Sequence, residues 1–84
     1  MSDRRGATVA RLRDALASVL GLDPATLDED VAMSAYGLDS RSAMNFLNEL
    51  EESAGVSLDL ELFADNPSLA ELADEVIDVS QRRP

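Results

Sequence analysis

Ser40 is the residue whose type and position in this 84-residue chain best suit it to carry chemistry. It stands in the stretch Tyr36–Arg41, which has loop composition up to Gly37 and helical spacing of apolar residues from Ala43 onward. Gly37 permits a backbone bend, and Asp39 and Ser40 are residue types that accept hydrogen bonds from the free N–H groups at a helix start. An anion attached to the Ser40 hydroxyl, such as a phosphodiester, would lie at the electropositive end of that helix, with a predicted stabilisation of about 0.3–1 kcal/mol.

The chain contains no histidine, cysteine or lysine, and this absence limits what Ser40 can do. A Ser–His or Cys–His nucleophile pair is excluded because its partner residues do not exist. Cysteine and histidine are also missing as metal ligands, and lysine as a Schiff-base former. We therefore expect no catalytic residue and no metal site. A hydrolase that uses Ser40 is disfavoured, since no base is available.

Acidic residues dominate the middle of the chain. Residues 23–78 hold fifteen of the seventeen acids and a single base, Arg41, so this segment has a net charge of −14. Such a field repels nucleic acid and acidic membranes and attracts basic patches on protein partners. The alternative interpretation is a solvated surface without a specific role. No long apolar run is present, so we expect neither a signal peptide nor a membrane span, and we predict a monomeric, cytoplasmic protein.

The first predicted helix follows a polar tail, Met1–Gly6, for which we expect disorder. Thr8 is predicted to cap the helix, and Gly21 is well placed to end it. Between them, apolar residues recur at steps of three and four, as in an amphipathic helix. These residues are Val9, Leu12, Leu16, Val19 and Leu20.

A long connection, residues 22–39, follows the first helix and opens with the turn Asp23-Pro24. A connection of this length in a compact domain is usually functional or held by its own apolar side chains. We expect a packed loop that includes a helical turn. The side chains available to hold it are Leu27, Val31, Met33, Tyr36 and Leu38.

The second predicted helix runs from about Ser40 to Ala54, and Gly55 closes it. Ala43, Phe46, Leu47, Leu50 and Ala54 form its buried stripe. Met44 lies one turn after Ser40 and is either a filler at the edge of the core or part of a docking surface. The residues predicted to face partners are Arg41, Met44, Asn48, Glu51 and Glu52.

The segment after Gly55 alternates partly between apolar and polar residues, as a strand would. We reject a strand because a lone strand would have no partner for its backbone groups, and we predict a short helical turn over 60–65. Ser68–Glu71 is a capping box that opens a last helix, and Ser80–Pro84 is a basic tail. The sequence therefore predicts an all-α fold, a small four-helix bundle with three main helices, one short helix and a long first loop. We expect one domain over residues 1–84, with an ordered core of about 8–79.

Gly37-Leu38-Asp39-Ser40 at the start of the second helix resembles the signature of acyl and peptidyl carrier proteins. The resemblance covers almost the whole chain. It includes Gly21-Leu22-Asp23-Pro24, the acidic second helix with Glu51-Glu52, Gly55-Val56-Ser57-Leu58, Leu62-Phe63 and Pro67-Ser68-Leu69-Ala70-Glu71-Leu72.

The resemblance implies that Ser40 bears covalent 4′-phosphopantetheine, which a phosphopantetheinyl transferase takes from coenzyme A, with Asp39 beside it as a recognition residue. Such a protein is a non-catalytic carrier of thioester-bound intermediates in an acyl-carrier-like bundle. Its partners would be acyltransferases, ketosynthases or adenylation-type loading enzymes with basic docking patches. Recognition by charge would speed encounter while leaving affinity modest.

Two positions depart from this family pattern. Many members have an apolar residue directly after the carrier serine, where this chain has Arg41; either a partner presents an acid to Arg41, or Arg41 pairs with Asp39 or a nearby glutamate. In addition, Asp59 stands where proline is common, and the spacing from Phe63 to Pro67 is one residue longer than usual.

The cargo is the open question. Because the chain starts at Met1 and ends soon after its last helix, we expect a free-standing carrier. Arg41 and the lack of lysine favour specialised metabolism, such as the assembly of polyketide or mixed polyketide–amino acid antibiotics, over housekeeping fatty-acid synthesis. One alternative is an aminoacyl or peptidyl carrier of non-ribosomal peptide-type assembly. An alternative of another class is an acidic helical module that only binds a protein partner.

Overall fold

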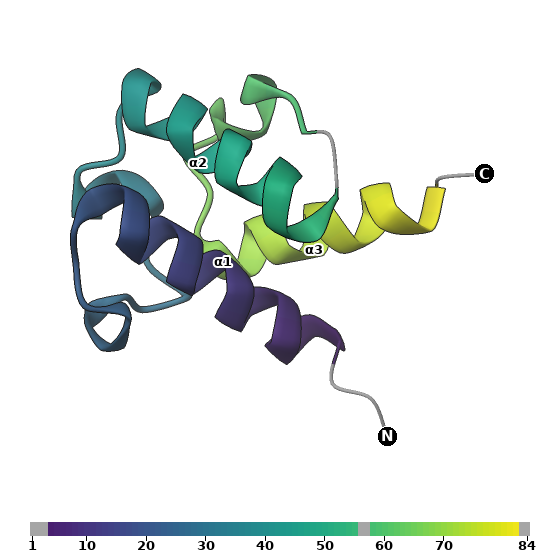
Figure 1. Cartoon of the computed structure of the whole chain (residues 1–84), viewed down its shortest axis with the longest axis horizontal. Helices are drawn as coiled ribbons and strands as arrows, with labels where there is room; N and C mark the ends of the chain where they lie inside the picture. The colour runs from purple at the N-terminus through teal and green to yellow at the C-terminus, as the bar shows by residue number, and fades with distance from the viewer. Residues whose placement is uncertain (1–3, 56–57, 83–84) are drawn as a thin grey trace.

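The computed structural model describes residues 4–55 and 58–82. Within these ranges the chain forms three α-helices and three 3₁₀ helices and no strand, so the all-α prediction is confirmed (Figure 1). An antiparallel bridge between Ala32 and Ser68 ties the first loop to the residue that precedes the last helix. In chain order the elements are α1 (Arg4–Leu20), η1 (Pro24–Thr26), η2 (Met33–Tyr36), α2 (Ser40–Ala54), η3 (Leu60–Phe63) and α3 (Leu69–Arg82).

Helix α1 begins at Arg4, so the predicted cap at Thr8 is wrong. The Thr8 hydroxyl donates to the carbonyl of Arg4 at 2.7 Å, a bond that a threonine inside a helix makes with the preceding turn. Arg5 forms an ion pair with Asp74 of α3 at 2.8 Å and so attaches this first turn to the bundle. Arg4–Gly6, expected in a disordered tail, are therefore helical, while Met1–Asp3 lie outside the described residues.

The first loop is packed as predicted, with two 3₁₀ helices instead of one turn. The backbone N–H of Asp28 donates to the Tyr36 hydroxyl at 2.8 Å, which closes the loop upon itself. The backbone N–H of Met33 donates to the carbonyl of Pro67 at 3.0 Å and links the loop to the segment just before α3. Leu27 and Met33 are buried, whereas Val31 is exposed and does not hold the loop.

Helix α1 packs against both α2 and α3, and the core lies between these three helices (Figure 1). Phe46 of α2 is fully buried, and its ring centroid lies 6.1 Å from that of Phe63 in η3. Helix α2 has the predicted bounds, and η3 lies within the short helical turn predicted over 60–65. The largest fully buried side chains are Leu12, Leu16, Met33, Phe46, Leu50, Leu69 and Leu72.

Helix α3 opens on the predicted capping box. The backbone N–H of Ser68 donates to Glu71 Oε1 at 3.0 Å, and the backbone N–H of Glu71 donates to Ser68 Oγ at 3.2 Å. The helix continues to Arg82, so the tail predicted from Ser80 is helical over its first three residues. Val56 and Ser57, part of the segment for which a strand was rejected, lie outside the described residues.

Candidate functional site

The start of α2 is built by a glycine and a reciprocal pair of hydrogen bonds. Gly37 has φ +96°, in the left-handed region, and ends η2 immediately before the turn into α2. Asp39 is the N-cap: its Oδ1 accepts from the backbone N–H of Ser42 at 2.9 Å, while its own N–H donates to Ser42 Oγ at 2.9 Å. Asp39 is therefore the residue that satisfies the helix terminus, as a capping aspartate does.

Ser40 is the first residue of α2 and is exposed. Its hydroxyl makes no hydrogen bond with any residue in the described ranges, in contrast to the hydroxyl of Ser42, which donates to Asp39 Oδ1 at 2.9 Å. Of the two serines in this turn, Ser42 serves the fold and Ser40 has a hydroxyl that is free to react.

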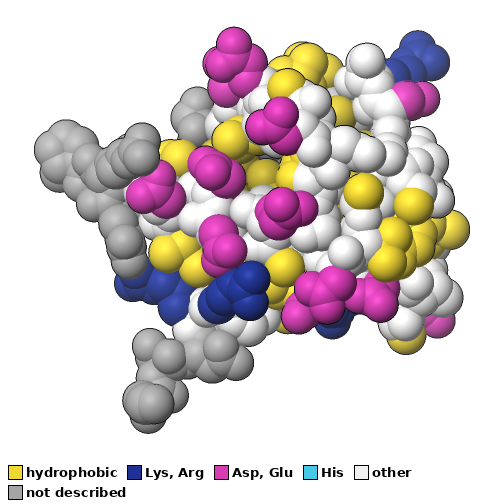
Figure 2. Space-filling view, turned by 180° about the vertical axis from the view of Figure 1, so that it is seen from behind, with side chains coloured by type: hydrophobic (Ala, Val, Ile, Leu, Met, Phe, Trp, Pro, Cys, Tyr) yellow, Lys and Arg dark blue, Asp and Glu magenta, His cyan; other side chains and the backbone are white. Residues whose placement is uncertain are grey.

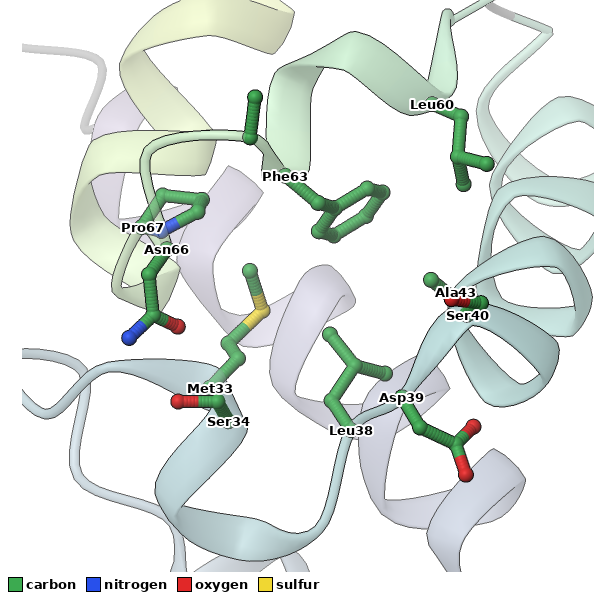
Figure 3. Close-up of a pocket in the computed structure, with 11 residues that line it drawn as sticks. Met33, Ser34, Leu38, Asp39, Ser40, Ala43, Leu60, Phe63, Asn66 and Pro67 are labelled. Carbon is green, nitrogen blue, oxygen red and sulfur yellow. The ribbon is translucent and has the colours of Figure 1, made fainter.

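A cleft of about 400 Å³ opens beside Ser40, between the first loop, the start of α2 and η3. In Figure 3 Met33, Leu38 and Phe63 point into this space, whereas the carboxylate of Asp39 points away from it. The walls are thus largely apolar and the rim is polar, as in many sites for small molecules. Its lining residues are Met33, Ser34, Leu38, Asp39, Ser40, Ala43, Leu60, Phe63, Ala64, Asn66 and Pro67.

Asp39 is held in its ionised form. The backbone N–H of Ser42, then the Ser42 hydroxyl and the backbone N–H of Arg41, lower the pKa of its carboxyl below the usual value because each donor stabilises the carboxylate. This carboxylate occupies the electropositive end of α2. An anion on Ser40 would therefore meet a negative neighbour there, contrary to the simple helix-terminus stabilisation expected from the sequence.

Arg41 is exposed, and within the described ranges it has no acidic side chain within ion-pair distance. The ion pairs present there, Arg5–Asp74 and Arg13–Glu29, both involve arginines of α1. The alternative in which Arg41 pairs with Asp39 or a nearby glutamate is thus not seen in the described ranges. Figure 2, which views the molecule from behind relative to Figure 1, shows acidic side chains spread widely over that face and fewer basic ones.

The predicted partner-facing residues lie on the exposed side of α2. The Met44 side chain is 49% exposed, which favours the docking interpretation over a core filler. Asn48, Glu51 and Glu52 are also exposed. Met44, Asn48 and Glu51 line a second hollow, of about 360 Å³, whose other lining residues are Leu47, Leu58, Asp59 and Leu60.

Sequence reasoning missed Leu60 as a surface residue. It is 39% exposed and lies between the two hollows, lining both. Its apolar neighbours at positions 58, 62 and 63 suggested that it is also a core residue. That Leu60 is exposed while these neighbours pack against the core follows only from how η3 lies against α2. In the part of the chain that the structure describes, no three acidic side chains are grouped so that they could hold a metal ion. The helices described there also lack the length and apolar character that crossing a bilayer requires.

A family model described as "Phosphopantetheine attachment site" matches residues 10–76. This chain belongs to that phosphopantetheine attachment family. Members are carrier domains with covalent 4′-phosphopantetheine, and the matched range contains α2, the cleft and most of α1 and α3.

Curated relatives include very long proteins that contain such a domain. The chain is 35% identical over 63 residues to the non-reducing polyketide synthase PKS16 of Cladonia grayi. The aligned residues make up 75% of this chain and 3% of that protein. It is 40% identical over 68 residues to the polyketide synthase ThaG of Burkholderia thailandensis. Here the aligned residues make up 80% of this chain and 1% of that protein. The chain thus spans only a few hundredths of the length of these relatives.

Solved structures agree on the fold. A free-standing peptidyl carrier protein from a secondary metabolic pathway of Acinetobacter baumannii superimposes with a TM-score of 0.81 at 27% identity, covering 92% of this chain and 96% of that one. The A1-type ACP domain from module 5 of MLSA1 superimposes with a TM-score of 0.83 at 27% identity, covering 92% and 78%. The predicted carrier-like bundle is confirmed.

Proposed function

We propose that Ser40 is the attachment site of 4′-phosphopantetheine in this carrier domain. The observation that carries the proposal is the exposed Ser40 hydroxyl, which has no hydrogen-bond partner in the described chain and lies at the rim of a largely apolar cleft. The site fits the group: the hydroxyl can become a phosphodiester, and the cleft gives a flexible arm room beside its root. When bound, the group supplies a terminal thiol that holds substrates as thioesters.

Loading requires a separate phosphopantetheinyl transferase. Ser40 Oγ forms a bond to the phosphorus next to pantetheine in coenzyme A, the pyrophosphate P–O bond breaks, and adenosine 3′,5′-bisphosphate leaves. We assign the base that takes up the hydroxyl proton to the transferase, because the Asp39 carboxylate beside Ser40 already accepts hydrogen bonds from Ser42, which lower its pKa and make it a weaker base. In this proposal the domain is a non-catalytic carrier, and enzymes that bind it perform the chemistry on its cargo.

The assembly of a polyketide, or of a mixed polyketide–amino acid product, is the pathway that we favour for this carrier. Support comes from the polyketide synthases among its relatives, to which it is 35–40% identical. The similarity to a peptidyl carrier protein, at 27% identity over 92% of the chain, supports an activated amino acid as the alternative cargo.

The partners would dock on the exposed side of α2 next to Ser40. Arg41, Met44, Asn48, Glu51 and Glu52 are all exposed there, and Met44 forms the edge of the second hollow. Acids at the far end of α2 suit loading and condensing enzymes with basic patches, for which long-range attraction raises the association rate.

The proposal is tested by incubating the protein with coenzyme A, Mg²⁺ and a broad-specificity phosphopantetheinyl transferase. Wild type should gain the mass of one phosphopantetheine, and Ser40→Ala should gain none. The loaded protein is then offered malonyl-coenzyme A with an acyltransferase, or amino acids and ATP with an adenylation enzyme, and the thioester is identified by mass. No gain on wild type would reject the carrier function and favour a helical module that only binds proteins.

A further inference from the structure

We propose that the guanidinium group of Arg41 holds the phosphodiester at the root of the arm once Ser40 is loaded. This inference rests on the proposed function, since it requires the phosphodiester to be on Ser40. It gives Arg41 a positioning role within the carrier itself, in addition to any contact with a partner.

The first step concerns the hydrogen-bond donors at the start of α2, which are not free to bind the phosphodiester. The Ser42 backbone N–H already donates to Asp39 Oδ1 at 2.9 Å, and the Ser42 hydroxyl donates to the same oxygen at 2.9 Å. These donors at the start of α2 are therefore committed to a carboxylate. Loading Ser40 adds a second anion one residue away from Asp39, and like charges at such a separation repel each other.

The second step concerns the cation that is available to balance this anion. Arg41 is the only base between residues 23 and 78, and it is the residue next to Ser40. It is exposed, with no ion pair to any acid in the described ranges, so no existing interaction has to be broken for it to bind the phosphate. Of the arginines on α1, Arg5 and Arg13 already pair with Asp74 and Glu29.

The third step concerns reach and geometry. Adjacent residues on a helix point in different directions, but the side chains of both Ser40 and Arg41 tilt toward the N-terminus, where the phosphate group would lie. Because both residues belong to the first turn of α2, no preceding turn of helix stands between them and the solvent. The planar guanidinium group donates two parallel hydrogen bonds to phosphate oxygens, a geometry that a lysine cannot reproduce.

A consequence for the loaded protein follows. With Arg41 in place, the added negative charge is balanced beside Asp39, and the first bonds of the arm are held near the rim of the cleft. Without Arg41, the same modification increases repulsion at the start of α2 and in an already acidic segment. Loading should therefore destabilise the variant and not the wild type.

The test compares apo and loaded forms of wild type, Arg41→Gln, Arg41→Lys and the control Arg11→Gln. Arg11 is likewise exposed and likewise lacks an ion pair in the described chain, but it lies on α1. At low ionic strength, loading should lower the melting temperature of Arg41→Gln by about 2–5 °C and leave wild type and Arg11→Gln within about 1 °C. Arg41→Lys should fall between them, and high salt should reduce the difference.

A second readout compares the apo and loaded forms of wild type. The side-chain Nε–Hε signal of Arg41, identified by its absence from spectra of Arg41→Gln, should shift on loading, while the other arginine signals should not. Arg41→Gln is needed only to assign the signal, so this measurement does not depend on how well the variants are loaded.

The outcomes separate the two proposals. If wild type gains no phosphopantetheine, the proposed function fails and this inference fails with it. If wild type is loaded but the Arg41 signal does not move and Arg41→Gln melts like wild type in both forms, only the inference is overturned.

Discussion

Asp39 and Ser42 hold each other at the start of α2 through two hydrogen bonds of 2.9 Å, each from the backbone N–H of one to the side chain of the other. Ser40 lies between them in sequence and takes no part in the pair. The structural duties of the turn thus fall on its neighbours, and the Ser40 hydroxyl remains exposed for modification. Replacing Ser40 should therefore remove loading without disturbing the fold.

The Asp39 cap should make stability depend on pH. Because hydrogen bonds from Ser42 lower the pKa of Asp39 in the folded state, its contribution is fully present above the unfolded-state pKa of about 3.9. The contribution is lost as the pH falls through the lower folded-state pKa. Wild type should be more stable than Asp39→Asn at pH 7, and the difference should shrink under strongly acidic conditions. Urea unfolding of both proteins at each pH measures this difference, and a constant value would contradict it.

Ser68 should be the more important cap for overall stability. Its side chain is buried and accepts from the backbone N–H of Glu71, while its own N–H is bound by the Glu71 carboxylate. Ser68→Ala should reduce the free energy of unfolding by about 1–2 kcal/mol, as lost N-caps do. Ser18→Ala, at an exposed position inside α1, is the matched control and should cause no loss. Equal stability of the two variants would argue against this cap.

Gly37→Ala should test the turn into α2. The added Cβ would meet no atom within 4 Å, so any effect comes from the backbone, which has φ +96°. An L-residue in this conformation is strained, and we expect a loss of about 1–2 kcal/mol in the free energy of unfolding, measured by urea titration. Wild-type stability in Gly37→Ala would mean that the turn adapts without strain.

Added salt should stabilise the protein. The segment 23–78 has a net charge of −14, and self-repulsion within it falls as salt screens the charges. The melting temperature should rise between low and moderate sodium chloride concentrations. A flat response would show that the acids are already compensated, for example by the arginines of α1.

The sequence predicted correctly those helix ends that are determined by residues next to them in the chain. Helix α2 has its predicted bounds because Asp39 caps it and Gly55, with φ +66°, closes it. Thr8 misled the prediction because threonine bonds backbone groups both at caps and inside helices, and the ion pair from Arg5 to Asp74 cannot be read from a sequence separation of 69 residues.

The site was predictable in part. The type and position of Ser40 identify it as the candidate attachment residue. The cleft beside it depends on η3 packing against α2, a long-range arrangement that the periodicity of apolar residues does not predict. The state of Arg41 was open for a similar reason, since whether an exposed arginine pairs with a nearby acid depends on side-chain directions. The sequence indicated that Asp39 could cap the start of the helix. It did not show that the hydrogen bonds from Ser42 keep a negative charge beside Ser40.

The most direct test of the central claim is to locate the modification within the protein. Wild type, Ser40→Ala and Ser34→Ala are treated with coenzyme A and a phosphopantetheinyl transferase, digested, and examined by tandem mass spectrometry. Ser34 is the matched control because it lines the same cleft and is also exposed. We predict one phosphopantetheine on Ser40 in wild type and Ser34→Ala and none in Ser40→Ala. Loading of Ser40→Ala at the wild-type level, or a modified peptide without Ser40, would contradict the account.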